Sequence, residues 1–188
     1  MIRFDRMGML VALTGTVAIG LLAGCAAAEN TAHDGATLSS TKASVQLLRN
    51  EAASRVPPGA IGEVSETDDV SIACESEEVD PKGLSRSWRS SVLLSIESGS
   101  AWRVLAMGQD LADSFAVDGW VASRALSEAV PNSLLQSDGS LTTIELSVTL
   151  PGADAAAEPA MVRIVSTGPC VNTDGADSDE IRKLDSEG

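Results

Sequence analysis

The stretch SWRSSVLLSIES, residues 87–98, carries the clearest strand pattern in the chain. Its large apolar residues, Trp88, Val92, Leu94 and Ile96, lie two or four positions apart, with mostly polar residues between them. Because successive side chains of a strand point to opposite faces, this alternation predicts a strand with one buried and one solvated face. It therefore favours a fold built on a sheet that is covered on one side.

Further strand patterns lie on both sides of this stretch. Residues 144–150 alternate cleanly, and shorter patterns lie at 69–74, 120–126 and 161–166. The sequence SDGS at 137–140 is a strong turn signal just before the 144–150 strand. The segment 120–126 is also compatible with a helix, so its interpretation stays open.

Two helices are expected, over residues 41–56 and 101–116. In both, apolar residues recur at spacings of three and four. The sequence PPG at 57–59 ends the first helix, and Asp118-Gly119 ends the second. The predicted order is α-β-β-α-β-β-β, an α+β fold in which an antiparallel sheet carries both helices on one face. The other face is then either solvated or covered by a partner.

Length and composition limit the classes of protein that this chain can belong to. Its 188 residues suit one domain, or two at most, and its 27 acidic against 13 basic residues give a net charge of −14. Hydrophobic residues make up 44 %, too many for a wholly disordered acidic protein. Aromatic residues make up only 3 %, and there is no tyrosine. These figures argue against nucleic-acid binding, which needs a basic surface and usually stacking aromatics.

The N-terminus has the pattern of an export signal. Arg3 and Arg6 precede an uncharged run over residues 7–28, within which small residues lead to Leu22-Ala23-Gly24-Cys25. A positive start, an apolar segment and small residues before a cleavage point define a secretory signal peptide. An uncleaved transmembrane helix is the alternative, because the run is long enough to span a bilayer.

The four residues 22–25 resemble the lipobox of bacterial lipoproteins. The resemblance implies cleavage between Gly24 and Cys25, transfer of a diacylglyceryl group to the Cys25 thiol, and a membrane-anchored protein on the extracytoplasmic side. The later Gly-Pro-Cys at 168–170 and the tethered α+β domain are similar to those of small actinobacterial lipoproteins. This second resemblance implies no particular activity.

The cysteine count fits the same interpretation. Of three cysteines, lipidation of Cys25 would leave Cys74 and Cys170, which allow a single pairing. Export places them in an oxidising compartment, so we expect a structural disulfide, with two buried free thiols as the alternative. Removing residues 1–24 takes away two arginines and one aspartate, which changes the net charge from −14 to −15.

Four segments are expected along the chain: a signal peptide at 1–24, a lipidated cysteine and flexible tether at 25–41, a single α+β domain at 42–170, and a disordered acidic tail at 171–188. The tether is rich in Ala, Thr, Ser and Gly, which cannot bury enough surface to order themselves. The only histidine, His33, lies there, and we expect it to be solvated rather than a ligand or base.

No catalytic set, cofactor site or metal site is apparent, so we do not expect an enzyme. A nucleophile–histidine arrangement needs a histidine within the fold, and a zinc site needs Cys and His clusters. Asp and Glu are abundant enough to supply a carboxylate pair, although most of them lie in turns or runs such as 75–80. Trp88 and Trp102 fit apolar stripes of the core, whereas Trp120 follows a turn glycine and is a candidate exposed binding aromatic.

The sequence therefore predicts a lipid-anchored, extracytoplasmic lipoprotein with a non-catalytic binding or scaffolding domain. Its expected partners are the membrane, through the anchor, and an envelope protein or hydrophobic ligand. Two alternatives stay open: a carrier of a lipid or other hydrophobic ligand, and a carboxylate-dependent hydrolase of envelope polymers.

Overall fold

A computed structural model describes residues 35–97, 101–123, 126, 132–137, 141–151 and 158–187, with only the backbone described at 65–67, 101, 102, 132 and 137. The fold is α+β with an antiparallel sheet, as predicted. The helices are α1 (Leu38–Ser54), α2 (Ala101–Ala116) and α3 (Asp179–Ser186), with a 3-10 turn at Pro58–Ala60. The strands are β1 (Ile61–Ala73), β2 (Ser85–Ile96), β3 (Trp120–Ala122), β4 (Asn132–Ser137), β5 (Thr143–Thr149), β6 (Ala160–Thr167) and β7 (Val171–Asn172).

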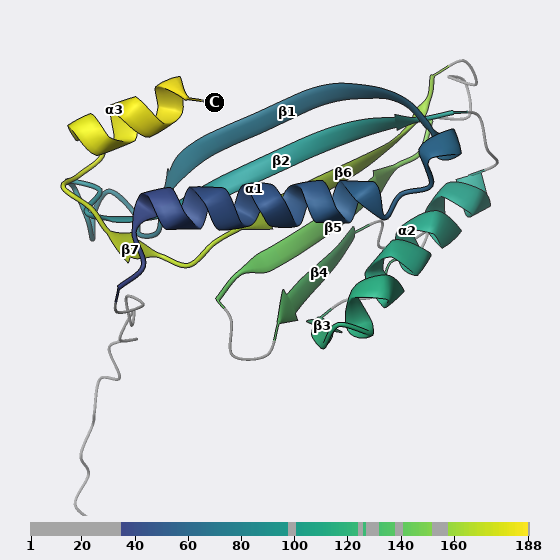
Figure 1. Ribbon diagram of the computed structural model, residues 1–188, viewed down its shortest axis with the longest axis horizontal. Helices are drawn as coiled ribbons and strands as arrows, with labels where there is room; N and C mark the ends of the chain where they lie inside the picture. The colour runs from purple at the N-terminus through teal and green to yellow at the C-terminus, as the bar shows by residue number, and fades with distance from the viewer. Residues whose placement is uncertain are drawn as a thin grey trace, which may run out of the picture.

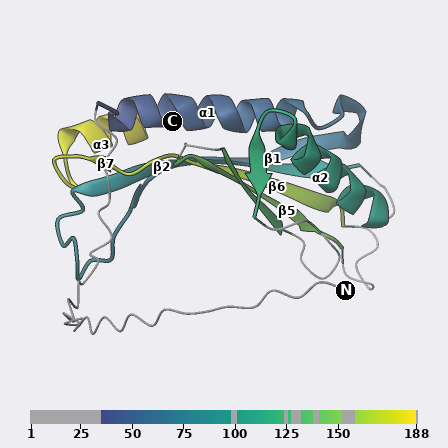
Figure 2. The ribbon, with the colours of Figure 1, turned by 90° about the horizontal axis from the view of Figure 1, so that it is seen from below.

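In the described part of the chain, the sheet has seven strands in the order β1-β2-β6-β5-β4-β3, and β7 pairs with β2 beyond the end of β6. Helices α1, α2 and α3 lie on one side of this sheet (Figure 2). Helix α1 runs across β2 and β6, and α2 lies over the β3–β5 end (Figure 1). Alternation sets this arrangement, because every second residue of β5 and of β6 is buried beneath the helices.

The first helix begins earlier than expected, inside the segment assigned to the tether. Thr37 caps it: its hydroxyl accepts from the Ser40 N–H at 3.1 Å, while the Ser40 hydroxyl accepts from the Thr37 N–H at 3.0 Å. This reciprocal capping box satisfies two N–H groups at the helix start. Leu38, the single large apolar residue of the expected tether, is 1 % exposed. The domain therefore begins near Thr37 rather than at residue 42.

The bounds and the number of strands also differ from the prediction. The strand expected at 69–74 begins eight residues earlier, at Ile61, and contains two register shifts against β2. Residues 62–69 of this strand, GEVSETDD, lack the alternation of a half-buried strand. Residues 132–137, which run into the predicted turn and for which no strand is expected, form β4, and this strand pairs with β5. The turn expected at 137–140 lies almost wholly outside the described residues.

The expectation of a disordered tail at 171–188 is wrong for most of that segment. Residues 171–172 form β7, and 179–186 form α3, whose N-cap Ser178 accepts from the Ile181 N–H. Ile181 and Leu184 are buried, three positions apart on one face of the helix. The many acidic residues of this segment predict disorder, although Ile181 and Leu184 lie at helical spacing.

The buried apolar residues form two separate groups. The main core lies between α1, α2 and the sheet and contains Ala52, Val56, Val92, Leu94, Ile96, Val104, Leu111, Ala112, Phe115, Leu126, Leu135, Ile144, Leu146, Val148, Ala160, Val162 and Ile164. The second group, here called the disulfide-end cluster, contains Leu38, Val45, Trp88, Val171, Ile181 and Leu184. It joins the start of α1 to α3 and β7.

Candidate functional site

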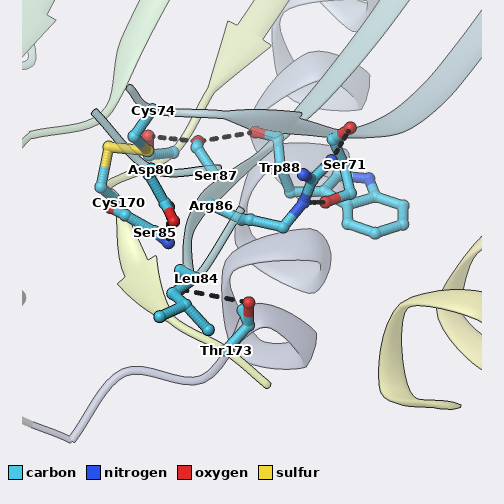
Figure 3. Close-up of a disulfide and its surroundings, with 11 residues drawn as sticks. Ser71, Cys74, Asp80, Leu84, Ser85, Arg86, Ser87, Trp88, Cys170 and Thr173 are labelled. Atoms are coloured by element: carbon cyan, nitrogen blue, oxygen red, sulfur yellow. Dashed lines mark hydrogen bonds between the residues drawn. A yellow bond between two sulfur atoms is a disulfide. The ribbon is translucent and has the colours of Figure 1, made fainter. Parts of the chain in front are cut away.

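The predicted Cys74–Cys170 disulfide is present, with an S–S distance of 2.05 Å (Figure 3). It joins the residue after β1 to the residue before β7. Gly168-Pro169-Cys170 separates β6 from β7, and the Gly168 N–H donates to the Trp88 carbonyl at 3.0 Å. The bridge therefore fastens the chain beside β2 just before it enters the C-terminal segment.

Trp88 is the largest side chain near this bridge, and it is fully buried. The Lys42 ammonium lies 4.7 Å from the centroid of its ring, a cation–π geometry. Lys42 also donates a hydrogen bond to the carbonyl oxygen of Leu184, in the last turn of α3. With 6 % of its surface exposed, Lys42 is a buried cation held by an aromatic ring and a helix C-terminus.

A second cation lies on the same strand as Trp88, two positions before it. The Arg86 guanidinium donates to the hydroxyl and carbonyl oxygens of Ser71, at 2.6 and 2.9 Å (Figure 3), and Ser71 is the residue of β1 that pairs with Trp88. Neither Lys42 nor Arg86 forms an ion pair with any carboxylate in the part of the chain that the structure describes. We call Thr41, Lys42, Arg86 and Trp88 the Trp88 site.

Buried polar atoms without a protein partner gather under α1. Among the described residues they are Thr41 Oγ1, Asp69 Oδ1, Trp88 Nε1, Ser90 Oγ and Ser166 Oγ. Asp69, Ser90 and Ser166 are direct neighbours across β1, β2 and β6. The other oxygen of Asp69 forms a 3.0 Å ion pair with Arg49 of α1. An unpaired buried polar group costs about 1–3 kcal/mol, so these atoms below α1 lower the stability of the fold.

A cleft of about 670 Å³ lies at the start of α3. It is lined by Pro81, Lys82, Asp174, Gly175, Ala176, Asp177, Ser178, Asp179, Glu180 and Arg182. The lining is mostly charged, which suits a polar ligand rather than an apolar one. Within the described ranges, no group of three or more His, Cys, Asp or Glu side chains is placed to hold a metal ion.

The sheet face opposite the helices is mostly polar. On the neighbouring strands β2, β6 and β5, this face carries mainly serine and threonine, with three charged and three apolar residues among them: Arg89, Arg163, Glu145, Leu93, Met161 and Val165. None of the helices or strands in the described ranges packs over it (Figure 2). Of the two possibilities left open by the sequence, a solvated face fits this composition.

Trp120, the candidate exposed aromatic, is only half-buried and belongs to the margin of the main core. Its ring meets Phe115 edge to face, with 5.7 Å between centroids. Val121, which follows it in β3, is 64 % exposed on the opposite face of the sheet. The side chain of Trp102 lies outside the described residues.

Asp80 organises the loop between β1 and β2. Its carboxylate accepts a hydrogen bond from the Ser85 N–H at 2.8 Å. The backbone N–H groups of Ser85 and then Leu84 lower the pKa of the Asp80 carboxyl, because they stabilise its ionised form. This contact fixes the entry into β2 next to the disulfide.

The predicted cleavage and lipidation residues, Gly24 and Cys25, lie outside the described residues, as does His33, which is expected to be solvated. In the part of the chain that the structure does describe, no helix is both long and apolar enough to cross a membrane. Comparison with known proteins adds no relative: no family model, no curated protein and no solved structure matches this chain.

Proposed function

We propose that this chain is a lipid-anchored, extracytoplasmic lipoprotein whose α+β domain has a non-catalytic binding role. One observation carries the proposal: the sequence Leu22-Ala23-Gly24-Cys25 at the end of an uncharged run, which resembles a lipobox.

The disulfide supports this proposal in two ways. A disulfide persists in an oxidising compartment, which the cytosol is not. The chain has three cysteines, and the bond between Cys74 and Cys170 leaves Cys25 without a cysteine partner in its own chain. The unpaired cysteine is therefore the one at the lipobox, where a thiol is needed for diacylglyceryl transfer.

The position of α1 fits an anchored domain. Residues 26–36 separate Cys25 from the Thr37 cap. Eleven residues reach at most about 36–40 Å when fully extended. That reach would keep the fold close to the lipid headgroups, with the start of α1 and the disulfide-end cluster nearest to the attachment point in the chain.

A non-catalytic role is supported by the contacts of the less exposed carboxylates, which are structural. Asp69 pairs with Arg49, and Asp80 accepts backbone N–H groups. Both stabilise the fold rather than face each other across a cleft, as the acid and base of a hydrolase would. The acidic residues that line the cleft at α3 are all exposed: Asp174, Asp177, Asp179 and Glu180.

Phase partition of the full chain, expressed in a bacterium that processes lipoproteins, tests the anchor. We expect the wild type in the detergent phase, with a mass equal to residues 25–188 plus a diacylglyceryl group. Cys25→Ala should move it to the aqueous phase or leave the precursor uncleaved. The matched control, Cys74→Ser/Cys170→Ser, should still partition into detergent. Wild-type protein without bound lipid would refute the proposal.

A hydrolysis assay on cell-wall polymer tests the binding role. We expect no activity above that of the Asp177→Asn/Glu180→Gln variant. Wild-type hydrolysis that this variant loses would instead establish the carboxylate-dependent hydrolase.

A further inference from the structure

The Trp88 site holds two cations that lack carboxylate partners among the described residues, in a chain of net charge −14. Burying a cation is unfavourable unless it is paired, and within the described ranges Lys42 contacts the Trp88 ring and the Leu184 carbonyl but no carboxylate. The indole N–H of Trp88 and the Thr41 hydroxyl add a buried donor each without a protein partner. This set of donors and cations matches an anionic oxygen group.

Leu184 currently supplies an oxygen to Lys42. Its carbonyl lies in the last turn of α3, where the helix dipole places partial negative charge. A phosphate or carboxylate oxygen carries more charge and forms a stronger hydrogen bond with an ammonium group. The C-terminal end of α3 thus occupies the position that an anionic group would take.

Ile181 and Leu184 fill the apolar part of the same site. They pack with Leu38, Val45 and Val171, next to the Trp88 ring. An alkyl chain would meet the same apolar wall. The combination of a cationic end and an apolar wall fits an amphiphile with an anionic headgroup.

Helix α3 is weakly held. Only Ile181 and Leu184 of its eight residues are buried, and the other six are exposed. A helix this short is marginal in water without tertiary contacts. Elements with few buried contacts open at a fraction of the free energy of global unfolding.

The chain can release α3 without disturbing the segment before it. The Thr173 N–H donates to the Leu84 carbonyl at 2.7 Å, and the Ala176 N–H donates to the Lys82 carbonyl at 2.9 Å. The disulfide lies still earlier, at Cys170. Helix α3 follows these fixed points at the end of the molecule, beside β1 (Figure 1). Opening at residues 177–178 would expose the Trp88 site and leave the rest in place.

We propose that α3 is a displaceable lid, and that the Trp88 site beneath it binds an amphiphile whose anionic headgroup pairs with Lys42. The proposal deepens the proposed function, because it names the ligand chemistry of the domain to which a binding role is assigned.

Titration of the full chain with water-soluble amphiphiles tests the lid and the site together. Calorimetry with hexyl phosphate and with hexanoate distinguishes the two sources of anionic oxygen; binding of either one supports the proposal. Neutral hexyl glucoside tests the need for charge, and inorganic phosphate tests the need for the alkyl chain. In parallel, bound ligand should speed amide exchange in α3 and leave exchange in the main core unchanged.

Two variants test the parts separately. The variant Ile181→Ser/Leu184→Ser should release α3 from the site. We expect this variant to bind the amphiphile about ten- to a hundredfold more tightly than the wild type does, because a lid that is open about 1–10 % of the time weakens the apparent affinity by that factor. Lys42→Met should bind at least about tenfold more weakly through loss of a charge-assisted hydrogen bond. Lys42→Arg should retain binding, and Lys183→Met, at an exposed lysine of α3, is the matched control.

Equal binding of hexyl glucoside, unchanged affinity in the released variant, or unchanged α3 exchange with ligand bound would each overturn the proposal. Main-core amide exchange shows that each variant is folded. The titration needs no lipid anchor, so protein recovered from the aqueous phase in the partition experiment is titrated in the same way. A failed anchor and a failed ligand site are therefore distinguishable.

Discussion

The main core and the disulfide-end cluster are built from the same kinds of element but are stabilised differently. Among the described residues, the main core unites two helices with four strands, β2, β4, β5 and β6, through many buried aliphatic side chains around Phe115. The disulfide-end cluster has six buried residues and adds a covalent bond, a cation–π contact and a helix-end hydrogen bond.

The two regions are stabilised differently because they bury different amounts of apolar surface. Hydrophobic stabilisation grows with the apolar surface removed from water, at roughly 25 cal/mol per Å². With six buried residues against seventeen among the described residues, the disulfide-end cluster gains less from that term than the main core does. Specific contacts supply the remainder, and such contacts are open to competition by a ligand, whereas a packed core is not. The two regions should therefore respond differently to substitution, reduction and acid.

Phe115→Ala should give the largest loss of stability. Phe115 is fully buried, meets Trp120 edge to face and lies 3.9 Å beneath the Arg55 guanidinium. Large-to-small changes at such sites cost about 3–5 kcal/mol. Chemical denaturation measures the change, with Val117→Ala, at an 88 % exposed residue, as the control expected to stay within about 0.5 kcal/mol. A loss below about 1 kcal/mol would show that the main core is not the dominant source of stability.

Cys74→Ser/Cys170→Ser should come next, with a loss of about 2–4 kcal/mol. The bond closes a loop with a sequence separation of 96 residues, which restricts the unfolded chain. In the folded state the effect should be local, so amide exchange should rise in β7 and α3 more than in β5 and β6. Equal increases in the two regions would contradict the division made above.

The sequence predicted the main core better than it predicted the disulfide end. Over the main core, alternation and helical spacing placed α2 at its observed bounds and β2, β5 and β6 to within two residues. Near the disulfide, composition was misleading: the acidic tail hid Ile181 and Leu184, and the small polar residues around Leu38 hid the start of α1. β4 was missed because NSLLQS has no clean alternation.

The disulfide pairing was predictable from cysteine arithmetic, but the Trp88 site was not. Lys42 and Trp88 lie 46 positions apart in sequence, and their contact depends on α1 crossing β2. Trp88 was expected in the core on periodicity alone, and it is there. Nothing in the local sequence of Lys42 indicates that its charge is buried.

Gly168→Ala should cost about 1–3 kcal/mol through overpacking. An added Cβ would lie 2.3 Å from Thr41 Cγ2 and 3.2 Å from Val45 Cγ1, so α1 would have to move away from β6. Thermal denaturation measures the loss, and Gly59→Ala, where a Cβ meets nothing within 4 Å, is the matched control. Adding Thr41→Ser removes the clashing methyl and should restore much of the stability. No rescue by that second change would mean that the contact is misassigned.

Acidification should loosen the disulfide end slightly and leave the main core unaffected, the smallest effect of the four. The backbone N–H groups of Ser85 and Leu84 lower the pKa of Asp80 in the folded state. A carboxyl with a lowered folded pKa contributes stability that is fully present above its unfolded pKa of about 3.9 and is lost as the pH falls through the folded value. Amide exchange at Ser85, corrected for intrinsic rates, should therefore accelerate only in strong acid.

Asp80→Asn separates this contact from general acid effects. The asparagine oxygen still accepts from the Ser85 N–H but does not titrate in this range. We expect near-normal protection at neutral pH and no acid-dependent step at Ser85, while β5 amides behave alike in both proteins. An acid step that persists at Ser85 in the variant would assign the titration to another carboxylate at this end of the molecule. The charged contacts around the disulfide would then act as a coupled group rather than through Asp80.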